Sequence, residues 1–465
     1  MSLDHIIVLM MENNSFDRML GALLPDRSGQ GGGIQGATGR YSNTDNTTGA
    51  VYALKPTQAR EVQDDPGHEL GDTLEQIVGP CKNFVNNFVK NYPSSSSADR
   101  QEIMSYYPDG SLPALHKLAK TFTICDRWFS SMPGPTWPNR CFVHTGTSLG
   151  FTDMKWLHYW DQTTLYQLLS AQGISWKIYY GDIPSTYILV NKPDPSQCYS
   201  LRYFYQDIAG PERSFPQYVF IDPAYFGKNP SDQHPPHDVL RGEALISDVY
   251  NALRSNDELW QRSLLVVTYD EHGGLFDHVY PASTIAPDNR RDGSGFDFAL
   301  FGVRVPTVLV SPWLDHGVIT DTFDHTSLLK FLIDKWGLND ALGARASWAG
   351  TNTFKKYLRR APRNTDRALP RIEGPRFLPA RVQTELTDHQ RALCDMAELL
   401  ASEVKDLSIR IPLQRRSLDR TPAAEAQLAM DRFEAYLLDR AKLRPAERSN
   451  AKRSRSRRGG VRRRK

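Results

Sequence analysis

The chain has 465 residues, which is enough for one large domain or two ordinary ones. Hydrophobic residues make up 40% and aromatic residues 11%, as is typical of a soluble globular protein, and no run of 18 apolar residues predicts a transmembrane helix. The five cysteines are odd in number and lack CxxC spacing, so we expect reduced thiols rather than a disulfide framework or a zinc site.

The formal net charge of +3 conceals an uneven distribution. Residues 451–465 contain nine lysines or arginines and no acidic residue, whereas the rest of the chain is mildly acidic. This segment predicts a disordered basic tail. Such a tail can attract anionic membrane lipid or nucleic acid, or it can act only as a solubilising end.

The first predicted element is a buried strand over the apolar run His5–Met11. It ends in Glu12 and Asn13, whose side chains carry carboxylate and amide oxygens. Residues 1–4 leave no room for a secretory signal, so we expect a cytoplasmic protein, or a secreted one if the chain is a processed form.

A long surface excursion is predicted over 20–49, a stretch rich in Gly, Ser, Asn and Asp. Long loops in compact domains frequently form part of the rim of a site. Beyond it, Pro66 and Gly67 break the chain just before His68 and a helical pattern. We therefore expect His68 to lie at the start of a helix and to face inward.

The stretch 132–147, MPGPTWPNRCFVHTGT, is predicted to place a hydroxyl group at the start of a helix. Its prolines keep Thr136 out of a helix interior, and Pro138 suits a first helical turn. Backbone N–H groups and the helix dipole favour an anion at such a position. The alternative is that Thr136 is an ordinary cap or turn residue.

Another histidine is predicted to lie in a rigid loop. His234 precedes two prolines, and a residue before proline is pushed towards extended geometry. It follows a helix and strand predicted within 165–181 and comes before a helix predicted over 242–256. That helix leads into the central motif of the chain.

The motif LLVVTYDEHGGLFDH, residues 264–278, starts with a short run that predicts a strand buried on both faces. Asp270 and Glu271 follow where the strand should end, and ligands of open α/β sheets bind beyond the carboxyl ends of the strands. Together with Glu12 and Asn13, they predict an oxygen cage for one divalent metal ion of uncertain identity. The alternative is a pair of solvated turns or helix caps.

The pattern of apolar residues after the central motif predicts how the chain divides into domains. A strand is predicted within 305–313, followed by a helix capped by Asp324, and the pattern is mostly helical from about residue 378. We therefore expect one α/β domain over 1–340, a mostly helical C-terminal extension over 341–450, and the basic tail.

Four blocks of the sequence carry a family resemblance: LMMENNSFDRMLG, GPTWPNRCFVHTGTS, HPPHDVLRGEALISDVYNALR and VVTYDEHGGLFDHVYP. They stand in one order within 4–335 and resemble the phosphoesterase family of non-haemolytic phospholipases C and related acid phosphatases. Asn14 and Ala282 depart from the pattern of that family. The resemblance implies an alkaline-phosphatase-like α/β fold, with a central mostly parallel sheet flanked by helices.

The resemblance also implies roles for individual residues. Thr136 resembles the nucleophile, which also binds the metal and forms a phosphothreonine intermediate, and Asn139 resembles a donor to the phosphate. Histidines at the family's phosphate-facing positions include one that protonates the leaving alcohol. The implied metal ligands are Glu12, Asn13, Thr136, Asp270 and Glu271, and the implied phosphate-facing histidines are His68, His234 and His278.

The predicted function is therefore metal-dependent hydrolysis of a phosphodiester, such as a phospholipid, in the manner of a phospholipase C. Trp128, Trp137, Trp156 and Trp160 could line a groove for the second substituent, or some of them could be core residues. One alternative is a phosphomonoesterase of the acid phosphatase type on the same site. Another is a binding protein that acts through its basic tail; the oligomeric state stays open.

Overall fold

The structure is a computed structural model of the chain. The residues that it describes are 2–23, 36, 40–155, 162–189, 194–227, 229–339, 342–348, 350–364, 371–375, 383–404 and 421–458.

Within the described part of the chain, an eight-stranded sheet forms the centre of the molecule, in the order β12-β6-β11-β10-β1-β9-β7-β8. All neighbouring strands are parallel except where β11 meets β10 and β6. The predicted α/β class with a mostly parallel sheet is therefore confirmed. The strands are β1 (His5–Met11), β6 (Thr123–Cys125), β7 (Trp176–Tyr180), β8 (Cys198–Ser200), β9 (Tyr218–Asp222), β10 (Ser263–Tyr269), β11 (Thr307–Val310) and β12 (Gly317–Ile319).

The two central strands are those that the apolar runs predicted. Every residue of β1 and of β10 is buried, and the two strands pair in parallel from His5 with Ser263 to Met11 with Tyr269. Strands covered on both faces are typically continuous apolar runs of this kind. Two small additional sheets pair β2 (Ser42–Thr44) with β3 (Val51–Ala53) and β4 (Lys55–Pro56) with β5 (Ser105–Tyr106).

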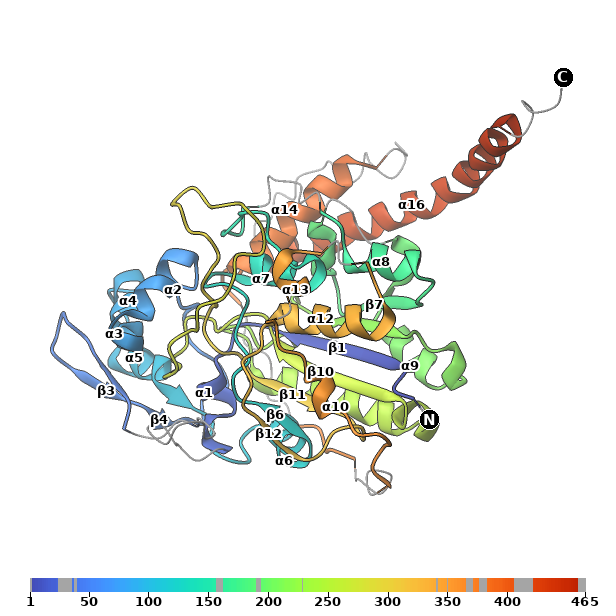
Figure 1. Ribbon diagram of the computed structural model, residues 1–465. Helices are drawn as coiled ribbons and strands as arrows, with labels where there is room; N and C mark the ends of the chain where they lie inside the picture. Colours follow the sequence, from blue (N-terminus) through green and yellow to red (C-terminus); the bar gives the residue numbers. More distant parts are fainter. Residues whose placement is uncertain are drawn as a thin grey trace.

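Helices flank the sheet, with α7, α8, α12 and α14 on one side of β1 and β10 and with α6 and α10 on the other (Figure 1). In chain order, the described helices are α1 (Phe16–Met19), α2 (Leu70–Gln76), α3 (Val78–Cys81), α4 (Phe84–Asn91), α5 (Ser97–Ile103), α6 (Leu115–Thr121), α7 (Thr136–Thr145), α8 (Leu165–Ala171), α9 (Arg202–Ile208), α10 (Val239–Arg254), α11 (Asp257–Trp260), α12 (His325–Trp336), α13 (Ala344–Ser347), α14 (Asp388–Ser402) and α16 (Pro422–Arg458).

The two largest of the four buried hydrophobic clusters among the described residues hold these layers together. The larger core joins both faces of the central sheet to the helices, and it contains the buried side chains of Trp128 and Trp137. A smaller core lies under α3, α4 and α5, where Leu275 and Phe276 pack against them. Half of the predicted excursion over 20–49, namely 24–35 and 37–39, lies outside the described residues. All five cysteines are described and free, as expected.

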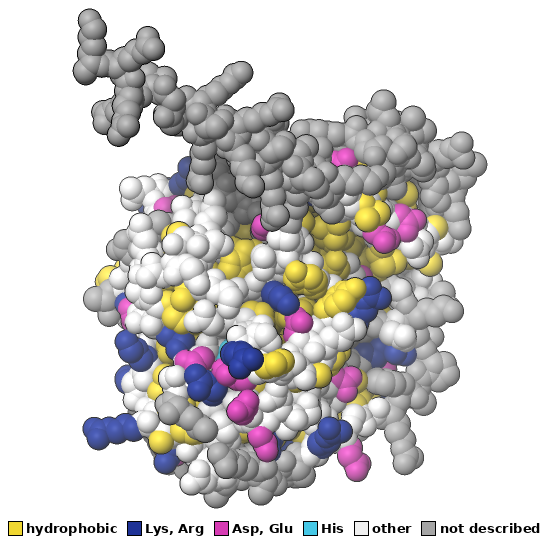
Figure 2. All heavy atoms as spheres, turned by 90° about the vertical axis from the view of Figure 1, so that its right-hand side faces the viewer, with side chains coloured by type: hydrophobic (Ala, Val, Ile, Leu, Met, Phe, Trp, Pro, Cys, Tyr) yellow, Lys and Arg dark blue, Asp and Glu magenta, His cyan; other side chains and the backbone are white. Residues whose placement is uncertain are grey.

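The described part of the C-terminal extension contains the helices α13, α14 and α16 together with non-helical stretches such as 371–375. Helix α14 packs along α16, and α16 extends away from the body of the molecule (Figure 1). The predicted basic tail overlaps the end of α16, and residues 459–465 lie outside the described residues. Among the described helices, none is long and apolar enough to cross a membrane. The face in Figure 2 carries interspersed acidic and basic side chains.

A buried carboxylate of α10 forms hydrogen bonds with the start of α6, on the side of the sheet where both helices lie. Glu243 of α10 is fully buried, and its Oε2 accepts hydrogen bonds from the backbone N–H groups of Ala114 at 2.6 Å and Leu115 at 3.0 Å. These N–H groups lie at the start of α6 and have no partner within that helix. Burial raises the pKa of Glu243 to about 7 in spite of these bonds.

Glu243 should therefore make the stability of the protein depend on pH. The unfolded chain releases this proton near the ordinary value of 4.5, so the contribution of Glu243 is full below that pH and is lost as the pH rises through about 7. We expect Glu243→Gln to gain stability relative to the unmodified protein across this interval, as measured by urea unfolding. Glu258→Gln is the control, because Glu258 is an exposed residue of α11. An identical pH dependence in all three proteins would contradict the prediction.

Candidate active site

Three neighbouring parallel strands end in acidic side chains at one edge of the sheet. β9 ends at Asp222, and β1 and β10 are followed by Glu12 and Asp270. Because Met11 pairs with Tyr269, Glu12 and Asp270 leave the sheet at the same level. The two strand ends that the sequence predicted to meet are therefore adjacent.

Arg140 of α7 connects all three strand ends. Its Nη1 donates to Asp222 Oδ1 at 2.8 Å, its Nε donates to Asp270 Oδ2 at 3.0 Å, and its Nη2 pairs with Glu12 Oε1. All four side chains are fully buried. One guanidinium group faces three carboxylates, so the cluster retains negative charge and can accept a further cation.

Thr136 is the first residue of α7, as the prolines around it predicted. Its Oγ1 lies 3.2 Å from Glu12 Oε2 and 3.2 Å from Asn13 Oδ1. Asn13 has a positive φ of 43°, a conformation that Asn tolerates, and its backbone N–H donates to Asp270 Oδ1 at 3.1 Å. The structure thus brings Thr136, Glu12, Asn13 and Asp270 together.

Asn139, one turn along α7, is engaged with the loop that precedes the helix. Its Oδ1 accepts a hydrogen bond from the backbone N–H of Met132 at 3.1 Å, and its Nδ2 donates to Gly134 O at 2.9 Å. Asn139 therefore fixes the loop that positions Thr136. The structure places its amide against backbone, whereas the resemblance implied a direct donor to the phosphate.

Glu12, Asn13, Thr136 and Asp270 bring together oxygen atoms, the kind of ligand that hard divalent cations take, and Glu271 is the next residue after Asp270. Glu12, Asn13, Thr136, Asp270 and Glu271 offer oxygen atoms only, and Glu271 Oε1 is buried without a hydrogen-bond partner among the described residues. Burial raises the pKa of Glu12 to about 7 and that of Glu271 to about 8. A cation held by these five residues would favour the ionised carboxylates.

His68 and His234 lie beside this group, on loops that precede α2 and α10. Their Nε2 atoms face one carboxylate: His68 Nε2 is 3.0 Å from Asp388 Oδ2, and His234 Nε2 is 3.4 Å from Asp388 Oδ1. His68 Nε2 is also 3.5 Å from Asn13 Nδ2. Both histidines are buried, so the inward orientation expected for His68 and the loop position expected for His234 are observed.

The electrostatic potential around the two rings is negative. Burial opposes protonation of His68, but Glu271 and Asp388 outweigh it and raise the pKa of His68 well above its ordinary value. Burial likewise opposes protonation of His234, but Asp65 and Asp388 raise its pKa. Positive charge is thus favoured at this position.

The C-terminal extension contributes residues that the sequence analysis missed. α14 begins with Asp388 and His389, and His389 Nδ1 lies 3.0 Å from Glu12 Oε2. The signal for this helix start was present, since Thr387 and Gln390 form a capping box. Its contact with residues near the N-terminus had no local signal.

Arg140 was missed although it stands in the same block as Thr136. The two residues are four positions apart, so they lie on the same face of α7. That spacing could have identified Arg140 as a partner of the same carboxylates. Asp65 and Asp222 were also missed.

Two other histidines lie in different surroundings. His278 Nδ1 is 2.6 Å from Asp17 Oδ2, and its ring stacks on Tyr41 with centroids 4.4 Å apart. His272 Nε2 is 2.8 Å from Gln76 Oε1. The structure therefore does not bring His278 into contact with Thr136. Trp128 and Trp137 are core residues, and Trp156 and Trp160 lie outside the described residues.

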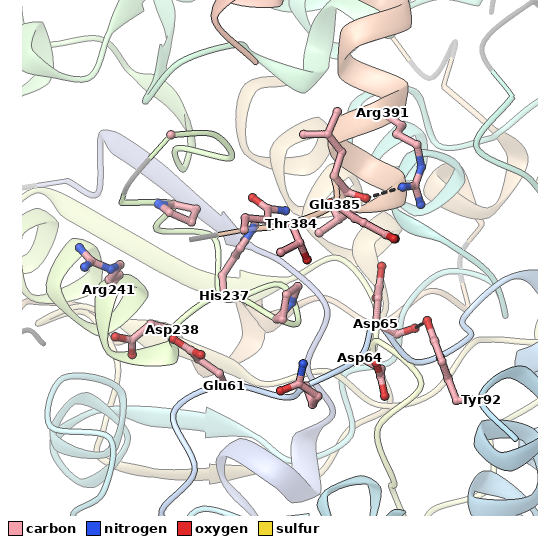
Figure 3. A pocket seen from close by; sticks show the side chains of 17 residues that line it. Glu61, Asp64, Asp65, Tyr92, His237, Asp238, Arg241, Thr384, Glu385 and Arg391 are labelled. Atoms are coloured by element: carbon pink, nitrogen blue, oxygen red, sulfur yellow. Dashed lines mark hydrogen bonds between the residues drawn. The ribbon is translucent and has the colours of Figure 1, made fainter. Parts of the chain in front are cut away.

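A pocket of about 470 Å³ adjoins the histidine pair (Figure 3). Asp65 lines it, and the Oδ1 of Asp65 is 3.8 Å from His68 Nδ1 and 3.9 Å from His234 Nδ1. Thr387, the neighbour of Asp388, lines the opposite wall. The charged lining residues are Glu61, Asp64, Asp65, Asp238, Glu385, Arg241 and Arg391.

The chain is similar in sequence to proteins named as phospholipases C. It is 30% identical to non-specific phospholipase C5 of Arabidopsis thaliana, over 92% of this chain and 88% of that protein. It is 32% identical to non-specific phospholipase C3 of the same plant, over 86% and 83%, and 29% identical to phospholipase C B of Mycobacterium tuberculosis, over 72% and 74%.

Among solved structures, a protein in the alkaline phosphatase superfamily from Vibrio parahaemolyticus aligns with 73% of this chain and 68% of its own, at 9% identity and a TM-score of 0.34. The model of the Phosphoesterase family matches residues 3–339, which is well over half of the chain. The protein therefore belongs to the Phosphoesterase family and is a hydrolase of phosphoric esters.

Proposed function

We propose that this protein is a metal-dependent phosphodiesterase of the phospholipase C type, with Thr136 as the nucleophile. The observation that carries the proposal is the position of the Thr136 hydroxyl, which lies between Glu12 and Asn13 at the start of a helix and beside a cluster of buried carboxylates. The names of the similar proteins, phospholipases C, support the same reaction class.

Glu12 is positioned to take the proton of the nucleophile. A threonine hydroxyl is weak at its ordinary pKa and needs an adjacent acceptor, and Glu12 Oε2 lies 3.2 Å from Thr136 Oγ1. A divalent ion held by Glu12, Asn13, Thr136, Asp270 and Glu271 would supply Lewis acidity to the hydroxyl and to a phosphoryl oxygen. Attack by Thr136 on phosphorus then breaks the bond to the leaving alcohol, which takes a proton from one of the histidines, and gives a phosphothreonine. Water next breaks the bond between Thr136 and phosphorus, which restores the hydroxyl and releases the phosphate product.

The surroundings of Thr136 suit the charge that develops on phosphorus. The histidine pair places positive charge beside the phosphoryl group, and Thr136 lies at the start of α7, the positive end of the helix dipole. Asn139 and Arg140 act on this geometry through the loop and through the carboxylates.

The pocket favours a diester over a monoester. Its lining carries five carboxylates and two arginines, so a substrate with one negative charge meets less repulsion there than a monoester dianion. A volume of about 470 Å³ also leaves room for a second substituent. A phosphomonoesterase of the acid phosphatase type is the alternative on the same residues.

Thr136→Ala should abolish turnover while ions still bind. We expect the rate of ester hydrolysis to fall by about 10³-fold or more, because the bond to phosphorus no longer forms on the protein. Thr136→Ser retains a hydroxyl and is the matched control, with measurable activity. Full activity of Thr136→Ala with metal present would contradict the assignment of the nucleophile.

Removal of divalent ions should also abolish turnover. We expect dialysis against a chelator to eliminate activity, because the Thr136 hydroxyl and the phosphate of the substrate then lack the ion that acts on both as a Lewis acid. Adding a divalent ion should restore activity. Asp270→Asn should need a concentration of ion at least about 10-fold higher for half-maximal activity. Asp109→Asn, on the surface, should behave like the unmodified protein; unchanged activity after complete chelation would refute metal dependence.

A comparison of matched soluble substrates tests the ester class. We expect a higher kcat/KM for a phosphodiester than for the phosphomonoester of the same alcohol, for the reason of charge given above. Both rates are measured on one preparation, with Thr136→Ala as the blank. A preference for the monoester would favour the acid phosphatase alternative.

A further inference from the structure

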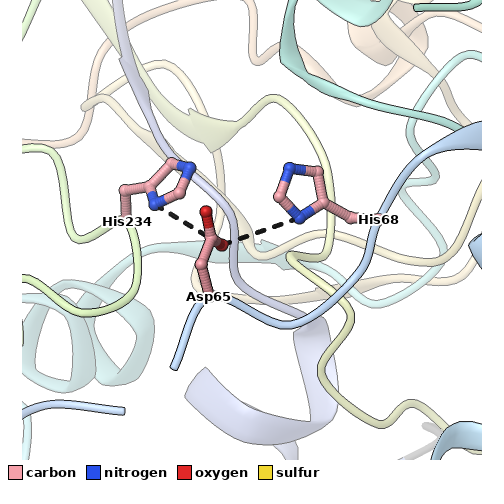
Figure 4. A group of neighbouring side chains, drawn as sticks. All are labelled: Asp65, His68 and His234. Atoms are coloured by element: carbon pink, nitrogen blue, oxygen red, sulfur yellow. Dashed lines mark ion pairs between the residues drawn. The ribbon is translucent and has the colours of Figure 1, made fainter. Parts of the chain in front are cut away.

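The histidine pair has a carboxylate on each side. On the Nε2 side, His68 lies 3.0 Å and His234 lies 3.4 Å from the oxygens of Asp388, the first residue of α14. On the Nδ1 side, Asp65 Oδ1 forms an ion pair with both rings, at 3.8 and 3.9 Å, and lies between them (Figure 4). The carboxylate that α14 brings to the histidine pair is therefore one of two.

His389, the next residue of α14, contacts the site at a different place. Its Nδ1 is 3.0 Å from Glu12 Oε2, and the same oxygen lies 3.2 Å from Thr136 Oγ1. The other oxygen of this carboxylate, Glu12 Oε1, pairs with Arg140 of α7. Side chains of two helices from distant parts of the chain thus hold the two oxygens of Glu12.

The contact between His389 and Glu12 defines where the imidazole carries its proton. Arg140 favours the ionised form of Glu12, and an ionised carboxylate only accepts hydrogen bonds. Burial, together with Arg140 and His234, lowers the pKa of His389 to about 3, so the ring is neutral and carries one proton. That proton lies on Nδ1, which donates to Glu12, and Nε2 keeps a lone pair.

The rest of the His389 ring lies in apolar surroundings. His389 is 1% exposed, and its Nε2 is buried without a hydrogen-bond partner among the described residues. The ring packs against Tyr225, with centroids 4.6 Å apart, and meets Trp137 edge-on at 6.4 Å. Burying an unpaired polar nitrogen costs free energy, and a phenylalanine would fill this space without that cost. The hydrogen bond to Glu12 therefore accounts for a histidine at this position.

We propose that His389 is a positioning residue for the hydrolysis, because its Nδ1–H fixes Glu12 Oε2 relative to Thr136 and to the divalent ion. The inference deepens the proposed function and rests on it for the role of Glu12. A carboxylate held by an outer hydrogen bond loses less freedom when it binds an ion or accepts a proton. Helix α14 would then act on the reaction through Glu12.

Three substitutions of His389 separate positioning from packing. In His389→Asn the amide nitrogen is two bonds from Cβ, as Nδ1 is, so it can donate to Glu12. In His389→Gln the amide nitrogen is three bonds from Cβ, as Nε2 is. His389→Phe keeps an aromatic ring against Tyr225 and Trp137 but has no donor.

The experiment is calorimetric titration of the metal-stripped full chain with Mn²⁺ and with Ca²⁺, since both ions take oxygen ligands. It is combined with kcat for a soluble phosphodiester at saturating ion. In His389→Phe and His389→Gln we expect the Kd of the ion to rise and kcat to fall, each by about 10-fold or more. His389→Asn should stay closer to the unmodified protein in both measurements. Asp395→Asn, on the exposed side of α14, is the control and should change neither.

The opposite order of the variants would overturn the inference. If His389→Phe matches the unmodified protein, or if a folded His389→Asn is no better than His389→Phe, the ring only fills space. Circular dichroism and thermal unfolding of each metal-free variant identify any protein that has failed to fold. If His389→Asn is one of these, a folded His389→Phe decides alone, since an unchanged Kd contradicts the positioning role and a raised Kd supports it.

The two measurements also separate this inference from the proposed function. An unmodified protein that binds an ion but hydrolyses neither ester class would refute the proposed function, and the Kd values would still decide whether His389 positions Glu12. An unmodified protein that binds neither Mn²⁺ nor Ca²⁺ would refute both.

Discussion

The ion-pair cluster around Arg140 is the constraint on which the site depends. Asp222, Glu12 and Asp270 end three adjacent strands, and one guanidinium group contacts all of them in a fully buried position. Carboxylates this close repel one another, and taking them out of water is expensive, so they need a fixed cation. Arg140 also lies on the helix that begins with Thr136. The same side chain that makes the strand ends compatible thus sets the distance between them and Thr136.

Residues near the C-terminal end of the chain also hold the site in place. The first turn of α14 inserts Asp388 between His68 and His234 and brings His389 to Glu12. α14 is held in turn by α16, which packs along it. The extension is therefore joined to the catalytic region by buried charge as well as by apolar contact. The alignments with the plant phospholipases reach beyond the family-matched region, which is consistent with a shared role for this segment.

The features of the site that a local sequence pattern encodes could be predicted from the sequence. β1 and β10 are continuous apolar runs followed by carboxylates, and the prolines around Thr136 restrict it to the start of a helix, so these positions were predictable. The contact of His68 with Asp388 joins residues 320 positions apart and leaves no trace in periodicity or composition. β9 was not predicted, since its five residues lie between prolines, and Asp222 was lost with it. Asn139 shows that a matching residue type does not settle what its side chain contacts. Its amide donates to the backbone of the preceding loop, and the sequence alone does not show that contact.

The region that the family model matches is shorter than the region that lines the pocket. The family match ends at residue 339, yet the pocket takes one wall from 383–391. A gene shortened after the codon for residue 340 would still encode a recognisable member of the family with every motif intact. Its product would have a pocket open on one side and two histidines facing solvent where a carboxylate now lies.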